Sequence, residues 1–324
     1  MKAIVYSKFG STDNFKLKEV EKPNPKDNEV LIKIHAASIN SWDWDMVRGR
    51  PLLYRLLFGI FKPKFPIIGC DVAGKIEAVG KNVSHLKLGD EVFGDVSPCG
   101  FGAFAEYVCA PENLIALKPA NATFEEAAAI PQGAVLALQS LQIKKDIKPE
   151  HHILINGAAG SMGPFALQLT KLKGATVTCV DAAPKLNMLS ALGADHVIDY
   201  TQEDFTKNGK RYDMIIEPVA NQSIFAYKRS LAPNGNYVIV GGKVRRIFQT
   251  LFVGSLISLF TDKKMRILVH HPNTNDLNIL KELVEAGKLK SIIDKTFPLQ
   301  DTPKALKYYG SGNAIGKVVI TVEE

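Results

Sequence analysis

The strongest constraint on the fold lies at residues 153–163, ILINGAAGSMG, where a β-type apolar run leads directly into a glycine-spaced turn. The glycines of the turn are Gly157, Gly160 and Gly163. A helix is predicted from about Met162, with Pro164 in its first turn, where a missing N–H costs least. A strand, a glycine turn and a helix N-terminus together are typical of a phosphate-binding loop, because the first amides of the helix face the anion. The G-x-x-G-x-x-G spacing is one residue longer than G-x-G-x-x-G, so the loop alone also fits a structural turn.

The next strand strengthens the prediction of a dinucleotide site. It ends at Asp181, eighteen residues beyond Gly163, where a dinucleotide-binding fold places the acid that binds the adenosine ribose. A carboxylate there repels a 2′-phosphate by about 4 kcal/mol at ~4 Å, which favours NAD(H) over NADP(H). Lys185 could offset this charge, or could be a solvated helix residue. The predicted cofactor-binding residues of this region are Gly157, Ala158, Ala159, Gly160, Ser161, Met162, Gly163, Asp181 and Lys185.

The texture of the 324-residue chain changes at about Phe124. Before it, short β-type segments are separated by Gly, Pro, Asn and Asp, which predicts a β-rich domain. From His152 onward strands alternate with helices, which predicts an α/β domain with a parallel sheet. An amphipathic helix is expected at 277–287, and the final strand, GKVVITV, is expected to return to the first domain.

Composition excludes several classes of protein. The net charge is +7, but the lysines are scattered and no aromatic platform lies among them, so nucleic-acid binding is not expected. The four cysteines form no CxxC pair, which fits a reducing compartment, and no signal peptide is recognisable. The uncharged run 247–261 is shorter than the ~20 residues of a membrane span. We therefore expect a cytoplasmic protein without a transmembrane segment.

Several motifs together resemble one family. NGAAGSMG, LGADHVIDY and GKVVITV are similar to the medium-chain dehydrogenase/reductase superfamily, and AASINSWDW, GCDVAGKIEAVG, GAFAEYV and VEAGKLKSIIDKTFPL are most similar to its zinc-free quinone oxidoreductase-like branch. The resemblance covers essentially the whole chain. It implies a GroES-like substrate domain at 1–124 and 291–324, a Rossmann NAD(P)-binding domain at 125–290, and a cleft between them. It also adds Tyr200 to the cofactor-binding candidates, while Gly241 and Gly242 follow a strand near the expected nicotinamide.

The zinc enzymes of the superfamily differ from this sequence at each ligand position. They have a cysteine where this chain has Asn40, His-Glu where it has Cys70-Asp71, and a third ligand near AIPQGA, which holds neither Cys nor His. A catalytic zinc needs three protein ligands. Cys99 also stands alone where the zinc enzymes carry a four-cysteine lobe. We therefore expect no zinc.

Without a metal, the acceptor has to stabilise its own developing charge, as quinones and α,β-unsaturated carbonyls do. The predicted function is thus a metal-independent transfer of hydride from NAD(P)H to a small hydrophobic quinone or enone. Asn40 is the predicted hydrogen-bond donor to the carbonyl oxygen, Asp43 could order its loop or cap a helix, and Tyr54 is a candidate proton donor. Trp42 and Trp44 could form an aromatic wall.

Two other functions stay open at this point: a zinc-dependent alcohol dehydrogenase and a dinucleotide-binding protein without turnover. The apolar segment 247–261 could line a substrate pocket, pack on a partner subunit or touch a membrane surface. A homodimer is therefore a candidate assembly.

Overall fold

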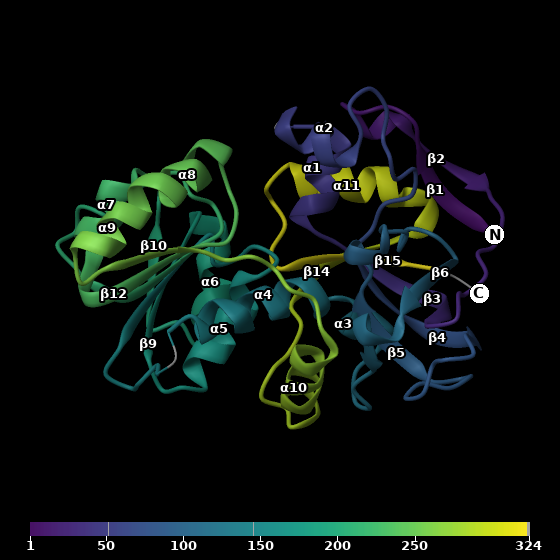
Figure 1. Cartoon of the computed structure of the whole chain (residues 1–324). Helices are drawn as coiled ribbons and strands as arrows, with labels where there is room; N and C mark the ends of the chain where they lie inside the picture. Colours follow the sequence, from purple (N-terminus) through teal and green to yellow (C-terminus); the bar gives the residue numbers. More distant parts are fainter. Residues whose placement is uncertain (51, 145, 323–324) are drawn as a thin grey trace. The chain divides into compact units, whose positions relative to one another are not determined.

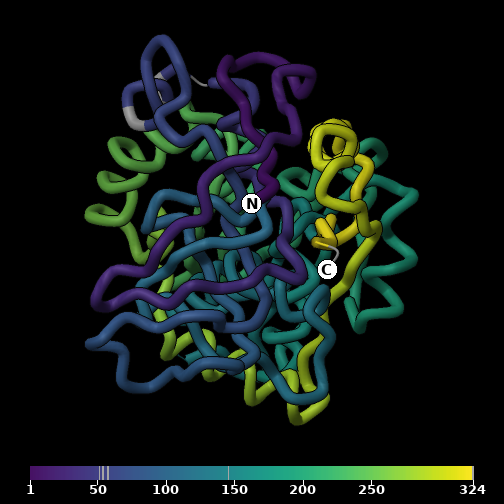
Figure 2. Tube along the Cα trace, turned by 90° about the vertical axis from the view of Figure 1, so that its right-hand side faces the viewer, coloured from purple at the N-terminus to yellow at the C-terminus, as the bar shows by residue number. Residues whose placement is uncertain are grey.

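The computed structural model describes residues 1–50, 52–144 and 146–322, and for residues 53, 54 and 57 the backbone alone. The chain forms two compact units, Met1–Val135 with Pro272–Glu324, and Leu136–His271. Both ends of the chain belong to the first unit (Figure 2). The bounds of these units differ from those of the predicted domains, since the segments 125–135 and 272–290 fall in the first unit.

The first unit is built on a seven-stranded sheet in which strands distant in sequence pair (Figure 1). The sheet order is β14 (Ile293–Pro298), β15 (Lys317–Thr321), β3 (Glu29–Ile39), β4 (Asp71–Val79), β5 (Glu91–Asp95) and β7 (Ile115–Leu117), with β6 (Tyr107–Pro111) also paired to β3. A separate two-stranded sheet joins β1 (Lys2–Tyr6) and β2 (Phe15–Glu19). The C-terminal strand β15 lies antiparallel to β3, so the predicted return of this strand to the first domain's sheet is observed.

Short helices and 3-10 turns complete the first unit. The α-helices are α1 (Ser41–Arg48), α2 (Leu52–Phe58), α3 (Phe124–Ala128), α10 (Thr274–Glu285) and α11 (Thr302–Gly310); the 3-10 turns are η1 (Thr12–Asn14), η2 (Ser97–Cys99), η3 (Glu112–Leu114) and η5 (Leu299–Asp301). Helix α4 (Pro131–Gln142) crosses from the first unit to the second. The predicted amphipathic helix is α10, which contacts β7 and accepts a side-chain hydrogen bond from Asn121 at Val284 O. These contacts place α10 in the first unit.

The second unit is a six-stranded, all-parallel sheet with helical connections. The sheet order is β10 (His196–Asp199), β9 (Thr176–Asp181), β8 (His152–Asn156), β11 (Tyr212–Glu217), β12 (Leu231–Ile239) and β13 (Lys264–Ile267). The helical elements are α5 (Gly163–Lys171), α6 (Ala183–Ala191), α7 (Ile224–Ser230), α8 (Val244–Gln249), the π-helical turn η4 (Thr250–Gly254) and α9 (Ser255–Phe260). The predicted α/β class is confirmed, because one unit is built on a mixed sheet of distant strands and the other on a doubly wound parallel sheet.

The order of the parallel strands fixes where a ligand can bind in the second unit. The chain runs outward from β8 through β9 to β10, and then returns to the other side of β8 with β11, β12 and β13. The direction of winding therefore reverses between β8 and β11. Open parallel sheets bind ligands at the carboxyl ends of the strands at such a point. No helix among the described residues is long and apolar enough to cross a membrane.

Candidate active site

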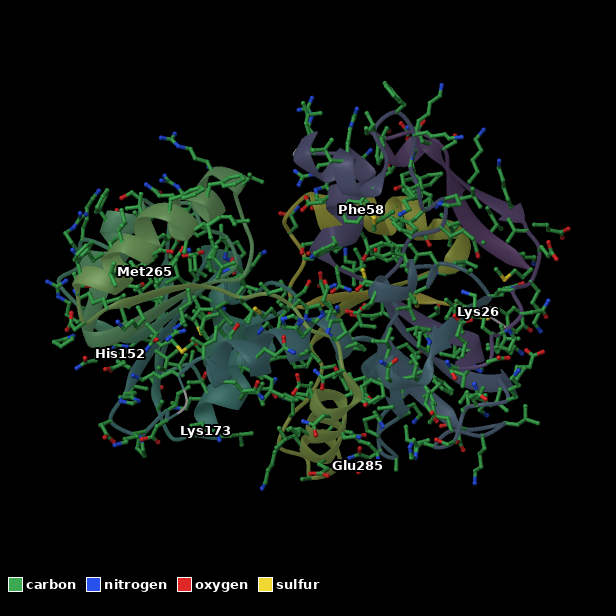
Figure 3. All side chains as sticks on the ribbon, viewed as in Figure 1. Lys26, Phe58, His152, Lys173, Met265 and Glu285 are labelled. Atoms are coloured by element: carbon green, nitrogen blue, oxygen red, sulfur yellow. The ribbon has the colours of Figure 1, made fainter. Side chains whose placement is uncertain are left out.

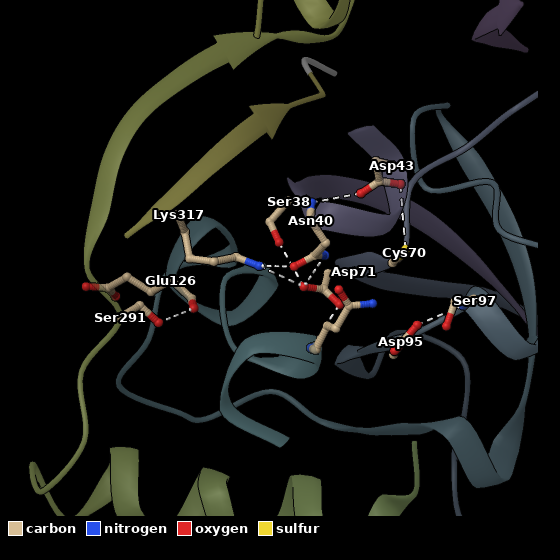
Figure 4. A network of polar contacts seen from close by, with 11 residues as sticks. Ser38, Asn40, Asp43, Cys70, Asp71, Asp95, Ser97, Glu126, Ser291 and Lys317 are labelled. Atoms are coloured by element: carbon tan, nitrogen blue, oxygen red, sulfur yellow. Dashed lines mark hydrogen bonds and ion pairs between the residues drawn. The ribbon is translucent and has the colours of Figure 1, made fainter. Parts of the chain in front are cut away.

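In the first unit, sheet pairing gathers polar side chains at the end of β3 (Figure 4). Ser38 of β3 is the pairing partner of Asp71 in β4, and Ile39 is the partner of Val318 in β15. The end of β3 therefore lies beside the beginnings of β4 and β15. Side chains from three regions of the sequence are brought together by this register, and all of them are almost completely buried.

The carboxylate of Asp71 is the centre of this cluster. Its Oδ2 accepts hydrogen bonds from Ser38 Oγ at 2.9 Å, Asn40 Nδ2 at 2.9 Å and Lys317 Nζ at 3.0 Å. Its Oδ1 accepts from the backbone amide of Gln132 at 3.0 Å. Burial raises the pKa of Asp71, while the Lys317 ammonium acts in the opposite direction. The cluster thus satisfies a buried carboxylate with four donors, one of them a cation.

Lys317 and Ser38 are residues of this cluster that the sequence reasoning missed, and Lys317 is the charged one. Its side chain is fully buried at the start of β15, and its Nζ also donates to Asn40 Oδ1 at 2.7 Å. The sequence does hold a signal, because a lysine opens the apolar strand GKVVITV and a lysine is almost never fully buried without a partner. The partner could not be named, since Lys317 and Asp71 are 246 residues apart.

Asn40, the predicted donor to the substrate, lies in the middle of this network with an exposed fraction of 1%. Its side-chain carbonyl accepts from Lys317, and one N–H of its amide goes to Asp71. An amide nitrogen carries two N–H donors. Among the described residues, the second N–H of the Asn40 side chain has no hydrogen-bond acceptor. The Lys317 ammonium fixes which end of the amide is the donor end, because a cation can only face the oxygen.

Asp43, in the first turn of α1, is fully buried and bonded to backbone amides. Its carboxylate accepts from the Asn40 N–H at 2.8 Å and the Gly69 N–H at 3.0 Å, and its Oδ1 lies 3.6 Å from the Cys70 thiol. Burial raises the pKa of Asp43 to about 7. The repulsion of Asp71 also raises this pKa, whereas the hydrogen bonds from the donors lower it. Asp43 therefore ties the first turn of α1 to the segment that leads into β4.

The remaining catalytic candidates lie near this cluster in sequence. Tyr54 falls in α2, and its side chain lies outside the described residues. Trp42 is 44% exposed and meets Phe58 edge to face, with ring centroids 5.6 Å apart. Trp44 instead packs against Gly310, where an added Cβ would lie 2.2 Å from the indole. Of the two tryptophans considered for an aromatic wall, Trp44 is thus a packing residue.

In the second unit, the glycine loop joins β8 to α5. Gly157 has φ +70°, and a Cβ there would lie 2.5 Å from Val219, so a side chain is excluded twice over. A Cβ at Gly163 would lie 2.1 Å from the carbonyl oxygen of Ala158, so the helix begins directly on the loop. Gly160 has more room, with 3.3 Å to Gly157 O. The intervening residues Ala158, Ala159, Ser161 and Met162 complete the loop.

The loop fits a pyrophosphate group by its backbone. The amides in the first turn of α5 have no acceptor within the helix, and the positive end of the helix dipole lies there. The loop comes directly after β8, beside the point where the strand order reverses. Such a loop binds an anion with main-chain N–H groups and leaves room for it because the glycines lack side chains.

Asp181 and Lys185 form a pair at the end of β9. The Asp181 carboxylate accepts from the amides of Ala159 and Ala182, each at 2.9 Å, and lies 3.9 Å from Lys185 Nζ. Tyr200 follows β10; its amide donates to the Asp181 carbonyl, and its side chain is 56% exposed. The side chain of Lys185 is only 14% exposed, so Lys185 is not a solvated helix residue. Its ammonium group offsets the charge of Asp181, on which the predicted preference for NAD(H) was based.

A second buried carboxylate braces the same end of the parallel sheet. Glu217, the last residue of β11, accepts from Asn156 Nδ2 at 2.8 Å and from the amides of Val219 and Ala220. Burial raises the pKa of this carboxyl. Gly242 and Gly241 approach the same turn. A Cβ at Gly242, which has φ +96°, would lie 2.3 Å from Val219 O, and a Cβ at Gly241 would lie 3.3 Å from Pro218 O. Glu217 was not predicted, although a charged residue ending the strand YDMIIE is a visible signal.

The residues at the zinc-enzyme positions do not suit a zinc ion. The Cys70 thiol is buried beside Asp43, and burial raises its pKa well above the usual value, which opposes the thiolate that zinc requires. Both oxygens of Asp71 already accept hydrogen bonds, and the Lys317 ammonium lies beside them. In the described part of the chain, no group of three or more His, Cys, Asp or Glu side chains could hold a metal.

Comparison with known proteins places the chain among oxidoreductases. The family described as Zinc-binding dehydrogenase matches residues 192–320, and the Alcohol dehydrogenase GroES-like domain matches residues 26–120. The chain is 35% identical to the quinone-oxidoreductase homolog, chloroplastic, of Spinacia oleracea, over 99% of this chain and 98% of the relative. It is 32% identical to the NADPH-dependent alkenal/one oxidoreductase, chloroplastic, of Arabidopsis thaliana, over 99% of this chain and 79% of the relative. The structure of the quinone oxidoreductase from Coxiella burnetii superposes with a TM-score of 0.90 at 29% identity, covering 100% and 99% of the two chains.

Proposed function

The chain belongs to the medium-chain dehydrogenase/reductase superfamily, in its quinone oxidoreductase-like branch, and from this premise we propose that it transfers hydride from NAD(P)H to a quinone or an α,β-unsaturated carbonyl without a metal. Relatives named as a quinone oxidoreductase homolog and an alkenal/one oxidoreductase support this class of acceptor. The cofactor supplies the hydride. The protein has to hold the cofactor and stabilise the charge that collects on the acceptor oxygen.

The observation that carries the proposal is the charged setting of the Asn40 amide. Lys317 donates to its oxygen and Asp71 accepts one of its N–H groups, so the amide is held in one orientation. In the proposal the second N–H of Asn40 donates to the carbonyl oxygen of the acceptor. A cation on the amide oxygen polarises the group and makes that N–H a stronger donor. As hydride adds to the conjugated carbon, the π electrons move to the carbonyl oxygen, where this hydrogen bond strengthens.

The second unit supplies the cofactor site in this proposal. The loop from Gly157 to Gly163 binds the pyrophosphate, Gly241 and Gly242 let the backbone approach the nicotinamide, and Tyr200 lies against the adenosine end. Because Lys185 and Asp181 form a neutral pair 3.9 Å apart, neither NADH nor NADPH is repelled by the pair as a whole. We therefore propose that both cofactors are accepted, which revises the preference for NAD(H).

The proton needed at the second carbon of the alkene, or at the quinone oxygen, comes from Tyr54 or from water in this scheme. Tyr54 stays a candidate on its sequence position in α2. The absence of zinc is part of the proposal; it is supported by the burial that raises the pKa of the Cys70 thiol and by the hydrogen bonds that both oxygens of Asp71 already accept. We also propose a cytoplasmic placement, which the four free cysteines support because a reducing compartment keeps thiols unpaired.

The test is oxidation of NADH and NADPH with a panel of quinones and enones, repeated with Asn40→Ala. Loss of the proposed donor should lower kcat by roughly 10²–10³-fold. Ser38→Ala is the matched control, because Ser38 also donates to Asp71 but does not contact the acceptor in the proposal. Equal rates for wild type and Asn40→Ala would refute the role of Asn40.

The same panel distinguishes the two alternative functions. Cofactor binding without oxidation by any acceptor would favour a non-catalytic dinucleotide-binding protein. Stoichiometric zinc in the purified protein, together with alcohol oxidation that a chelator abolishes, would favour an alcohol dehydrogenase.

A further inference from the structure

The positive charge of the chain is concentrated in one segment of the second unit. Residues 224–266 hold eight of the 40 Lys and Arg residues and one of the 33 acidic residues, Asp262. The formal charge of this segment is therefore +7, which equals that of the whole chain, and the remaining residues are neutral in sum.

The same segment exposes an apolar surface. Helix α8, turn η4 and helix α9 follow one another without a break from Val244 to Phe260, and α7 contacts η4. Figure 1 draws α8 and α9 at the two ends of one helical run on the second unit, with α7 beside it. We call the outer side of these helices the α7–α9 face. Its exposed apolar residues, with their exposed fractions, are Phe225 (53%), Phe248 (44%), Leu251 (47%), Phe252 (64%), Leu256 (57%), Leu259 (73%) and Phe260 (78%).

These side chains are not left over from packing, because the helix already buries its other side. Thr250, Gly254 and Ile257 are buried against the unit, and Gly254 allows close approach to Met265, where an added Cβ would lie 2.9 Å away. Met265 is labelled beneath this helical layer in Figure 3. On the outer side, the rings of Phe248 and Phe252 stack with centroids 6.3 Å apart. The helix is thus apolar on the side that packing does not need.

Cations flank the apolar run in the sequence. Lys243 and Arg245, at the start of α8, are exposed, whereas the ammonium groups of Lys263 and Lys264, which follow α9, donate to backbone carbonyls of the unit. On α7, Arg229 is exposed one helical turn from Phe225. Phenylalanine and leucine in the centre, with lysine and arginine around them, is the pattern of helices that lie in the interface of a membrane.

We propose that the α7–α9 face binds peripherally to a bilayer that contains anionic lipids. The phenylalanines and leucines enter the boundary between headgroups and acyl chains, and the flanking cations contact the headgroup phosphates. A second copy of the chain fits this face less well. Two such faces in contact would bring together two segments of formal charge +7, each with Asp262 as its one acidic residue, and these segments would repel each other. A bilayer with negative charge complements both properties of the face.

The experiment is sedimentation of the full-length protein with vesicles, which requires no turnover and is independent of the proposed reaction. Vesicles of phosphatidylcholine are compared with vesicles that contain about one third phosphatidylglycerol, at low salt and at about 0.5 M NaCl. We expect binding to the anionic vesicles, with at least about a tenfold loss of affinity at high salt.

Two variants separate the apolar and the charged contributions. Phe252→Ser/Leu259→Ser removes apolar contacts, and Arg229→Glu/Arg245→Glu reverses two cations; each should lower the affinity by at least about tenfold. Matched controls on the first unit are Leu17→Ser/Leu88→Ser and Lys16→Glu/Lys87→Glu, which change residues that are also exposed and should bind as wild type. Thermal unfolding verifies that each variant is folded.

Absence of wild-type binding to anionic vesicles at low salt would overturn the proposal, and so would α7–α9 variants that bind as well as their controls. Sedimentation velocity addresses the competing occupant. A wild-type dimer that Phe252→Ser/Leu259→Ser dissociates, with no binding to vesicles, would assign the face to a second copy instead.

Discussion

Replacement of Lys317 by methionine tests whether the buried network at the end of β3 is held by one cation. Methionine has a similar length and no charge, so the change leaves the Asp71 carboxylate buried without its ion partner. Removing one member of a buried ion pair typically costs about 3–5 kcal/mol, because the remaining charge is uncompensated. For a unit of this size each kcal/mol lowers Tm by about 2–4 °C, so we expect a fall of roughly 6–20 °C.

The loss should depend on pH with a defined sign. Burial already raises the pKa of Asp71, and Lys317→Met removes the cation that opposes this shift. A carboxyl whose pKa is higher in the folded state than in the unfolded state supports folding below the unfolded pKa, and this support is lost as pH rises through the folded pKa. The deficit of the variant relative to wild type should therefore be largest above neutral pH and should shrink as the pH is lowered toward about 4.

Differential scanning calorimetry from about pH 5 to about pH 8 measures both effects. The double variant Asp71→Asn/Lys317→Met removes both charges and should recover at least about half of the lost stability. Lys22→Met is the matched control, because Lys22 pairs with Glu77 on the surface, with 38% and 43% of the two side chains exposed, and should cost less than about 1 kcal/mol. If Lys317→Met unfolds within about 2 °C of wild type at neutral pH, the network is not held in this way.

Three further changes probe other parts of the two units. Burial raises the pKa of Asp43 to about 7 in the folded protein, above its value in the unfolded chain. The free energy of unfolding of wild type should therefore fall by about 2–3 kcal/mol between about pH 5 and about pH 8 through this group. Urea denaturation at several pH values measures this fall, which Asp43→Asn should lack. Gly163→Ala places a Cβ 2.1 Å from Ala158 O, so the loop must shift, and NADH binding should weaken by at least about tenfold in fluorescence titration. Gly160→Ala brings a Cβ only to 3.3 Å from Gly157 O and should weaken binding less; equal losses would contradict the loop geometry. Lys185→Ala exposes the Asp181 charge and should weaken NADPH more than NADH by at least about tenfold, while Asp181→Ser should do the reverse; an unchanged ratio of the two Kd values would show that the pair does not face the 2′-position.

The glycine loop and the parallel sheet were predictable because their causes are local. The strand 153–155, the glycines after it and the helix from Gly163 follow one another in sequence, and each is specified by its own composition. The loop-to-helix contact at Gly163 was implied by the glycine itself. Lys185 could be named from the sequence as a possible partner of Asp181, but its position four residues later did not decide between this role and that of a solvated helix residue.

Asn40 and Asp43 were chosen from the sequence as candidate site residues, and Asp71 was named only at a ligand position of the zinc enzymes; the partners of all three could not be read from the sequence. Asn40 was selected as a donor, and the structure adds that its oxygen is bonded to an ammonium group from the other end of the chain. Lys317 and Glu217 each had a weak signal, a charge at the edge of an apolar strand. No local rule says which buried group such a charge will meet.

The sequence by itself determined the two types of fold, the strand–glycine loop–helix at residues 153–163 and the family, because these depend on periodicity, glycine positions and motifs that are read along the chain. Only the tertiary structure decided the ionic partner of Asp71, the orientation of the Asn40 amide and the collection of apolar and basic side chains on the α7–α9 face. Strand pairing is the physical reason, since antiparallel β3 and β15 set residues 277 positions apart within hydrogen-bond distance, and a buried charge is stable only next to the partner that this register supplies.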